Sequence, residues 1–230
     1  MINVEKAIRR NKLELTKFEK IRQNFNDNPR ISIIKKGENP KINPNNNSQK
    51  CFYDFQDSLD EILRACYKES KVKEPFSFFD EEYEKIIPKV GVLGLESGMQ
   101  ITAGLFRDFY IISELICVEY LNYMKDDFWH LLTRLQDYGK FRFIEEPSMS
   151  SNIKAKYPKL FNKRGHIYKI SRNYFIYQTE YGYCRSLGFL EVKWDRNMDF
   201  KQVINNYLNT FDILYKINEL LYQSHLKYGG

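Results

Sequence analysis

The sequence predicts an α+β fold, and three observations support this prediction. Apolar residues recur at helical spacing through the first two-thirds of the chain, up to about residue 138. Runs rich in aromatic and β-branched residues follow at 140–194, and a last apolar stripe at helical spacing covers 199–224. Helices first, strands next and a helix last predict an antiparallel sheet of three to four strands at 140–194, with the long C-terminal helix packed on it.

The segment 90–124 is predicted to be the central element of the fold. Placed at about 100° per residue, it shows one polar wedge and apolar side chains over most of the remaining surface. We therefore expect a buried central helix, with 96–124 as its core, and partners on two or three sides. Four charged residues exclude a membrane-spanning helix here, and no membrane association is expected. They are Arg107, Asp108, Glu114 and Glu119.

The N-terminal part is predicted to hold a basic helix followed by a linker. An apolar stripe at helical spacing predicts a helix at 3–25, and 31–34 fit a short strand. The stretch 35–50 has almost no apolar anchor and predicts a flexible linker or exposed loop. We expect two units: 1–50, a basic helix with its linker, and 51–230, a single α+β domain.

Shorter elements fill the rest of the chain. Apolar faces at helical spacing predict helices at 54–68 and 126–138, and Pro88 ends a third, short helix at 80–87. In the expected sheet, short polar breaks part the strand runs, which suits antiparallel hairpins. The strand runs are 140–146, 166–170, 174–179 and 183–194.

Positive charge is concentrated at the N-terminus. Residues 1–50 hold 12 Lys and Arg against 5 Asp and Glu, whereas the other 180 residues hold 24 against 25. A basic arm of this kind is a candidate for contact with a polyanion, and a solvated helix face is the alternative. The arm residues that we expect to contact nucleic acid are Arg9, Arg10, Lys12, Lys35 and Lys36.

Aromatic and basic residues alternate through 140–194. Stacking faces beside a cationic groove are what single-stranded nucleic acid requires, and a winged helix with its helix at 152–163 is a second interpretation. The alternative is structural, because aromatics form strands well and lysines protect sheet edges. The nucleic-acid-binding candidates in this region are Arg142, Lys163, Arg164, Tyr168 and Arg172.

One short motif could carry catalysis. In a strand, Glu191 and Lys193 project to the same face, where a carboxylate and an ammonium can bind a divalent metal and orient water. This stretch resembles the E-x-K half of the PD-(D/E)xK nucleases. The resemblance implies a second acid on the preceding strand, where Glu180 stands, and a glutamine on the following helix, where Gln202 stands. It implies Mg²⁺ or Mn²⁺ as the metal; the alternative is a plain charge pair on a strand.

Cysteine and histidine spacing predicts no other metal site and no cofactor. The four cysteines include no close C-x-x-C pair, which favours reduced thiols in a cytoplasmic setting. The three histidines include no pair at metal-ligand spacing. The cysteines are Cys51, Cys66, Cys117 and Cys184, and the histidines are His130, His166 and His225.

With no strong catalytic motif, the sequence favours a non-catalytic interaction protein. We expect it to bind nucleic acid, or to be a subunit of a complex that acts on nucleic acid, and we expect a protein partner. The metal-dependent nuclease is the first alternative. A protein-binding regulatory or immunity-type module is the second.

Overall fold

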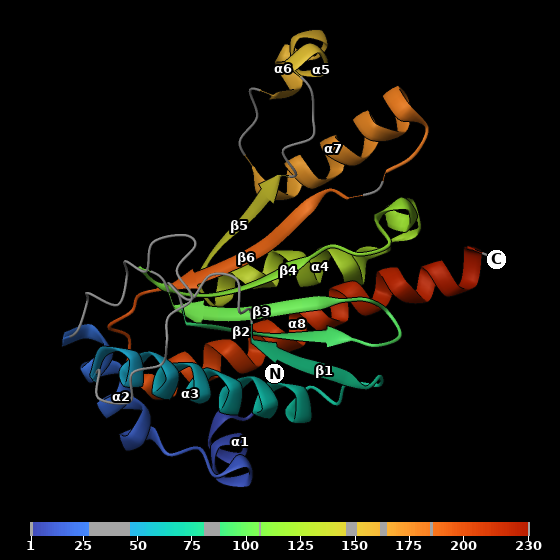
Figure 1. Cartoon of the computed structure of the whole chain (residues 1–230). Helices are drawn as coiled ribbons and strands as arrows, with labels where there is room; N and C mark the ends of the chain where they lie inside the picture. Colours follow the sequence, from blue (N-terminus) through green and yellow to red (C-terminus); the bar gives the residue numbers. More distant parts are fainter. Residues whose placement is uncertain are drawn as a thin grey trace.

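The computed structural model describes residues 2–27, 47–80, 88–105, 107–145, 151–161, 165–184 and 186–229. It confirms a mixed α and β fold with an antiparallel sheet and a C-terminal helix packed on it (Figure 1). The sheet has six strands in the order β1-β2-β3-β4-β6-β5. They are β1 (Phe76–Asp80), β2 (Lys89–Gly94), β3 (Gln100–Leu105), β4 (Phe109–Glu114), β5 (Lys140–Glu145) and β6 (Gly188–Trp194).

The predicted central helix at 90–124 is wrong. This segment forms β2, β3 and β4, followed by the 3-10 helix η3 (Val118–Tyr123). Each strand is short and mostly apolar, and such a run cannot be distinguished from a buried helix by periodicity alone. The decisive feature is the turn at 95–98, where Gly98 has a φ of 71° and the chain reverses between β2 and β3.

This turn is held by a carboxylate from a neighbouring segment. Glu74 is buried, and one of its oxygens accepts hydrogen bonds from the backbone N–H groups of Glu96 and Ser97, each at 3.0 Å. Its other oxygen accepts the Ser97 hydroxyl hydrogen bond at 2.6 Å. The hairpin of β2 and β3 therefore depends on a polar contact that local sequence reasoning does not reveal.

The expected sheet at 140–194 is only partly present. Residues 140–145 and 188–194 are strands, but 166–170 and 174–179 belong to the helix α7 (His166–Tyr181). Ile170 and Tyr174 lie one helical turn apart and are buried, and Gly182 ends the helix at a φ of 73°. Tertiary packing has overridden the strand propensity of the aromatic residues. Two short helices precede α7: α5 (Ser151–Lys156) and α6 (Pro158–Phe161).

The inner face of the sheet is covered by α8 (Phe200–Tyr228), α3 (Asn47–Glu69) and α4 (Asp126–Arg134). The long C-terminal helix is thus confirmed. The helix predicted at 54–68 begins earlier, so residues 47–50 are helix and not linker. The helix predicted at 126–138 ends in a 3-10 turn, η4 (Leu135–Asp137). The strand predicted at 31–34, residues 35–46 of the predicted linker and residues 81–87 of the predicted short helix lie outside the described residues.

The N-terminal segment is two helices, not one helix at 3–25. These are α1 (Val4–Asn11) and α2 (Leu15–Asp27), and the break is at Lys12, which has a φ of 55°. Ala7 and Phe18 are buried in the main core, and the helices pack against α3 and α8. The division of the chain at residue 50 into an arm and a domain stays a prediction.

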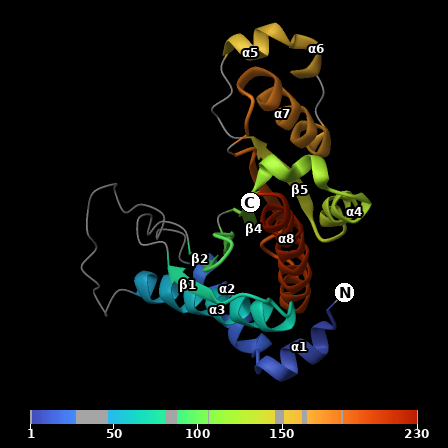
Figure 2. The same cartoon turned by 90° about the vertical axis from the view of Figure 1, so that its right-hand side faces the viewer.

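Figures 1 and 2 place α1, α2 and α3 at one end of the molecule and α5, α6 and α7 at the other. The sheet and α8 run between these two ends. None of the described helices has the length and apolar composition needed to cross a membrane.

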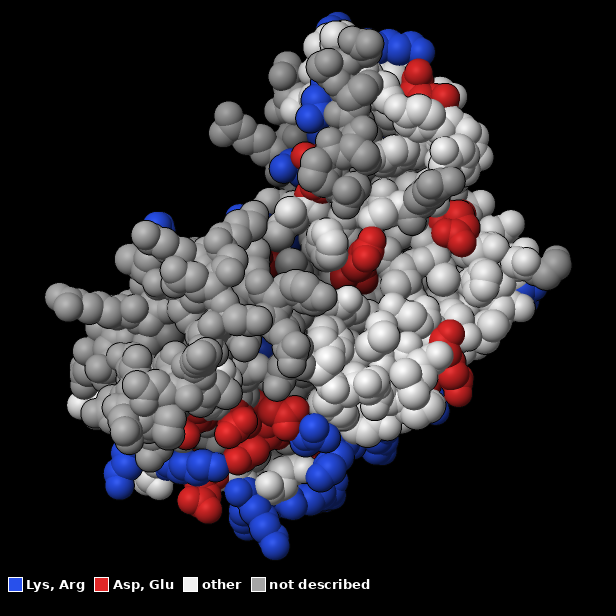
Figure 3. Space-filling view, viewed as in Figure 1, with Lys and Arg blue, Asp and Glu red and all other residues white. Residues whose placement is uncertain are grey.

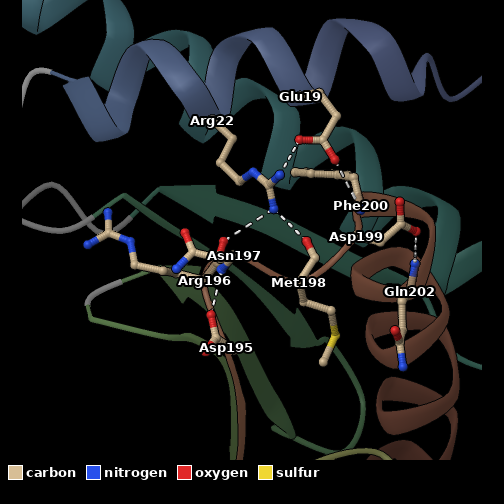
Figure 4. Close-up of polar contacts among 9 residues, drawn as sticks. All are labelled: Glu19, Arg22, Asp195, Arg196, Asn197, Met198, Asp199, Phe200 and Gln202. Atoms are coloured by element: carbon tan, nitrogen blue, oxygen red, sulfur yellow. Dashed lines mark hydrogen bonds and ion pairs between the residues drawn. The ribbon is translucent and has the colours of Figure 1, made fainter.

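The close-up in Figure 4 shows how α2 holds the connection between β6 and α8. The Arg22 guanidinium donates hydrogen bonds to the backbone oxygens of Arg196, at 3.2 Å, and Met198. It also pairs with Glu19, whose other oxygen accepts the backbone N–H of Phe200 at 3.1 Å. One arginine and one glutamate of α2 therefore satisfy backbone groups of this connection and of the first residue of α8.

We expect Arg22→Ala to lower the free energy of unfolding by about 1–3 kcal/mol. Hydrogen bonds to a charged group contribute about 1.5–3 kcal/mol, and the loss is partly offset where water can replace the donor. Arg9→Ala is the control, because Arg9 is exposed and its guanidinium donates to the Glu5 carbonyl of its own helix, at 3.5 Å. Urea unfolding of both variants measures the difference, and equal losses would contradict this role for Arg22.

Candidate nucleic-acid interface

Strand side chains alternate between two faces of the sheet. Phe109, Ile111 and Val192 point to the inner face and are fully buried. We call the opposite side the outer face, and it carries most of the polar, charged and glycine positions of β2 to β6. Its members include Lys89, Gly91, Gln100, Thr102, Gly104, Tyr110, Ile112, Phe189, Glu191, Lys193, Lys140 and Arg142.

Strand register aligns five outer-face residues in one line across the sheet. Lys89 pairs with Gly104, Gly104 with Tyr110, Tyr110 with Lys193, and Lys193 with Lys140. We call this line the transverse row. Adjacent strands lie about 4.8 Å apart, so the row is about 19 Å long. It places three lysines, one tyrosine and one glycine side by side on five different strands.

The tyrosine of this row lies flat against the neighbouring strand. A Cβ atom on Gly104 would be only 2.5 Å from the ring of Tyr110, so a side chain at that position would displace the ring. The glycine therefore allows the ring to cover the backbone of β3. The result is an aromatic surface, half-buried, between Lys89 and Lys193.

Two grooves flank the transverse row. The first has a volume of about 270 Å³ and follows β3 and β4 from Lys89 and Tyr110 toward Glu114 and Phe189. The second, of about 620 Å³, lies beyond the edge strand β5 and shares Lys140 with the row. The second groove is lined by Gln136, Gly139, Lys140, Phe141, Gly165, His166, Ile167 and Tyr168. The row thus runs from one groove to the other.

A buried carboxylate pairs with two cations, one in the transverse row and one next to it. The side chain of Glu191 is 7% exposed, and it forms ion pairs with Arg142 and with Lys193, whose Nζ lies 3.4 Å away. One negative charge faces two positive charges, so this part of the outer face keeps a net positive charge. Pairing also restricts both cations to defined positions on the sheet.

His166, which lines the second groove, accepts a hydrogen bond from the backbone of the edge strand β5. The backbone N–H of Phe143 donates to Nδ1 of His166 at 3.2 Å. Burial lowers the pKa of His166, and the positive charges of Lys169 and Arg142 lower it further. The neutral ring accepts this hydrogen bond, which protonation of Nδ1 would remove.

The residues of the nuclease resemblance lie on different elements. Glu191 and Lys193 share the outer face, but Glu180 lies in α7 and not on a strand beside β6. Its carboxylate accepts a hydrogen bond from Lys156 at 2.8 Å and one from Tyr157; these bonds, Lys156 first, lower the pKa of Glu180. Gln202 lies in the first turn of α8, where its backbone N–H donates to Asp199 at 3.2 Å (Figure 4). The nuclease function stays a prediction.

The predicted arm residues lie among acidic side chains. Arg10 donates to Glu69 of α3 at 3.2 Å, and Lys12 ends α1. Figure 3 shows blue and red side chains intermingled over the lower part of the molecule, where Figure 1 places α1, α2 and α3. The charge of the arm is therefore partly balanced by acids within the fold. Lys35 and Lys36 lie outside the described residues.

Of the residues at 140–194 that were predicted to contact nucleic acid, one is buried in the interior and two lie at the surface. Arg172 is buried, pairs with Glu145 and donates to Asn173, and burial lowers its pKa. Tyr168 is 37% exposed and lines the second groove. Arg142 contacts Glu191 beside the transverse row. Lys163 and Arg164 lie outside the described residues.

Sequence reasoning missed Lys89, Tyr110 and Lys140 as members of one surface. Tyr110 lies within the helix that the sequence predicts at 90–124, and Lys89 directly precedes that segment, so strand pairing could not be used to align them. Residues 109–114 gave no clear strand signal, because burial alternates in the structure but polarity does not: Ile112 lies on the outer face and Ser113 is buried.

Comparison of the chain with models of protein families, with curated proteins and with solved structures found no match.

Proposed function

We propose that this protein binds single-stranded nucleic acid along the transverse row, between the two grooves. The observation that carries the proposal is the strand register, which aligns Lys89, Tyr110, Lys193 and Lys140 across the sheet. This surface differs from the sequence-based expectation, which relied on the N-terminal arm and on supposed strands at 166–179.

The residue types suit a single strand better than a duplex. Lysine side chains neutralise phosphates, and an aromatic ring accepts an unpaired base by stacking. Tyr110 supplies such a ring within the row, and Tyr168 supplies a second one in the adjoining groove. Because every base has a stacking face, we expect little dependence on base sequence.

Removing one lysine of the row should change the salt dependence of binding. For Lys140→Ala we expect the log–log slope of affinity against salt to fall by about 0.7, the value for one phosphate contact on a single strand. Fluorescence anisotropy with labelled poly-dT and poly-U oligonucleotides at several salt concentrations measures this slope. Lys140 is exposed, so the fold should not change.

The aromatic member of the row should behave differently. Tyr110→Leu keeps an apolar cover over Gly104 but removes the stacking face. We expect a loss of about 1–3 kcal/mol in binding free energy with an unchanged salt slope, because stacking involves no counterion. The same anisotropy titration separates the two effects, and a thermal melt verifies the fold.

Lys125→Ala is the matched control for both variants. Lys125 is exposed and precedes α4. This helix packs against α8 on the inner face of the sheet, away from the transverse row. We expect its affinity and slope to equal those of the wild type. If Lys125→Ala and Lys140→Ala have equal effects, binding depends on net charge alone and the interface is wrong. Absence of wild-type binding at low salt would contradict the function itself.

A further inference from the structure

Three side chains of the types that bind metal ions lie together where η3 meets the end of α8. A thiol, a carboxylate and an imidazole each offer one ligand atom, and these atoms all lie within 4.8 Å of one another. The residues are Cys117, Glu119 and His225. None of them lines the transverse row or either groove beside it.

The fold holds this cluster together through other contacts. Cys117 directly precedes η3, and His225 lies in the last turn of α8. Between them, the ring of Tyr120 packs edge-on against the ring of His225, with 5.4 Å between centroids. Tyr123 stacks on Tyr228 with 4.2 Å between centroids. The ligand atoms are therefore positioned by packing before any ion binds.

A second observation concerns the histidine. Its Nδ1 atom is buried and has no hydrogen-bond partner in the part of the chain that the structure describes. Buried ring nitrogens normally find a partner, because burial without one is costly. A metal ion is one partner that this nitrogen can take, and either ring nitrogen can serve as a ligand.

The mixture of ligand types selects a class of metal. Sulfur and imidazole nitrogen are poor ligands for Mg²⁺ and Ca²⁺, which prefer oxygen. Zinc binds thiolate, imidazole and carboxylate together, commonly with tetrahedral geometry. Three protein ligands leave a fourth position for water or another group.

We infer that Cys117, Glu119 and His225 form a zinc site that joins η3 to the C-terminal turn of α8. Glu119 is exposed and the other two residues are half-buried, so an ion enters from solvent. Zinc takes the thiolate form of cysteine, so binding releases the thiol proton of Cys117 to solvent. Because the metal binds the folded arrangement, it stabilises the end of α8 by mass action.

The site also has a second thiol in its surroundings. Burial raises the pKa of Cys184 to about 12, and the negative charge of Glu119 contributes to this rise. Burial likewise raises the pKa of Cys117 to about 11, again with a contribution from Glu119. A bound cation would offset the negative charge of Glu119.

Cobalt titration of the full chain tests the site. Co²⁺ replaces Zn²⁺ at such sites and gives a charge-transfer band when a thiolate is a ligand. We expect one equivalent of Co²⁺ to produce this band in chelator-treated protein, and one equivalent of Zn²⁺ to abolish it. Cys117→Ser should lose the band, and His225→Gln and Glu119→Gln should weaken binding by at least about tenfold, the smallest effect typical even of outer-shell changes.

Cys51→Ser is the matched control, because Cys51 is a half-buried cysteine of α3 and not a member of the cluster. It should keep the band and the wild-type affinity. Circular dichroism verifies that each variant folds, and Glu119→Gln, at an exposed position, tests the site even if Cys117→Ser unfolds. Lack of the band in the wild type, or its equal loss in Cys51→Ser, would overturn the proposal.

Discussion

Replacing Phe109 by alanine is expected to lower the free energy of unfolding by about 3–5 kcal/mol. Its side chain is 0% exposed, and its ring contacts four other aromatic rings from two helices and a strand. Truncation removes the transfer free energy of the ring and leaves a cavity that rigid neighbours cannot close. The ring partners are Phe55, Trp194, Phe200 and Tyr207.

Phe175→Ala is the control for this variant, since Phe175 is 64% exposed on α7. We expect it to change the free energy of unfolding by less than about 0.5 kcal/mol, as is usual for surface substitutions. Urea unfolding with a common slope gives both values. A loss of under about 1 kcal/mol for Phe109→Ala would place this residue outside the core and contradict the fold.

Asn218→Leu is expected to cost about 2–4 kcal/mol, although it makes the interior more apolar. Asn218 is 0% exposed in α8, and its Oδ1 accepts the backbone N–H of Ile116 at 3.1 Å. Its Nδ2 donates to the hydroxyl of Ser113 at 2.9 Å and to the carbonyl of Glu114 at 3.0 Å. Leucine makes none of these bonds, and each buried group left without a partner costs about 1–3 kcal/mol.

Ser113→Ala separates hydrogen bonding from packing. This change removes one of the three bonds of Asn218 and leaves the other two, so we expect a loss of about 1 kcal/mol. Thermal and urea unfolding of the two variants give the ratio of the effects. Equal losses would show that Asn218 acts mainly through the serine, and no loss for Asn218→Leu would contradict its role at the end of β4.

The parts of the fold that could be predicted are those in which one helix or one strand shows its own sequence repeat. The apolar stripe of α8 repeats at three and four over many turns, and no short strand can imitate so long a repeat. Glu191 and Lys193 were placed on one face of a strand because the strand period is two, and the structure has them there. These conclusions needed no knowledge of neighbouring elements.

The candidate site was not predictable in the same way. Tyr110 was assigned to a helix, so its alignment with Lys193 could not be inferred. The supposed strands at 166–179 are rich in aromatic residues, but Tyr174 and Ile170 are buried on one side of a helix. Local propensity is weak at such positions, and packing against η3 and β5 decides the outcome.

The sequence by itself determined the α+β class, the long C-terminal helix and the strand that carries Glu191 and Lys193, because each depends on a repeat within one segment. Only the tertiary structure decided which strands are neighbours, and hence that Lys89, Tyr110, Lys193 and Lys140 form a row. It also brought Cys117 and His225 together, although 107 residues separate them in the chain. Strand pairing and helix docking are non-local, because they are set by which apolar faces bury each other.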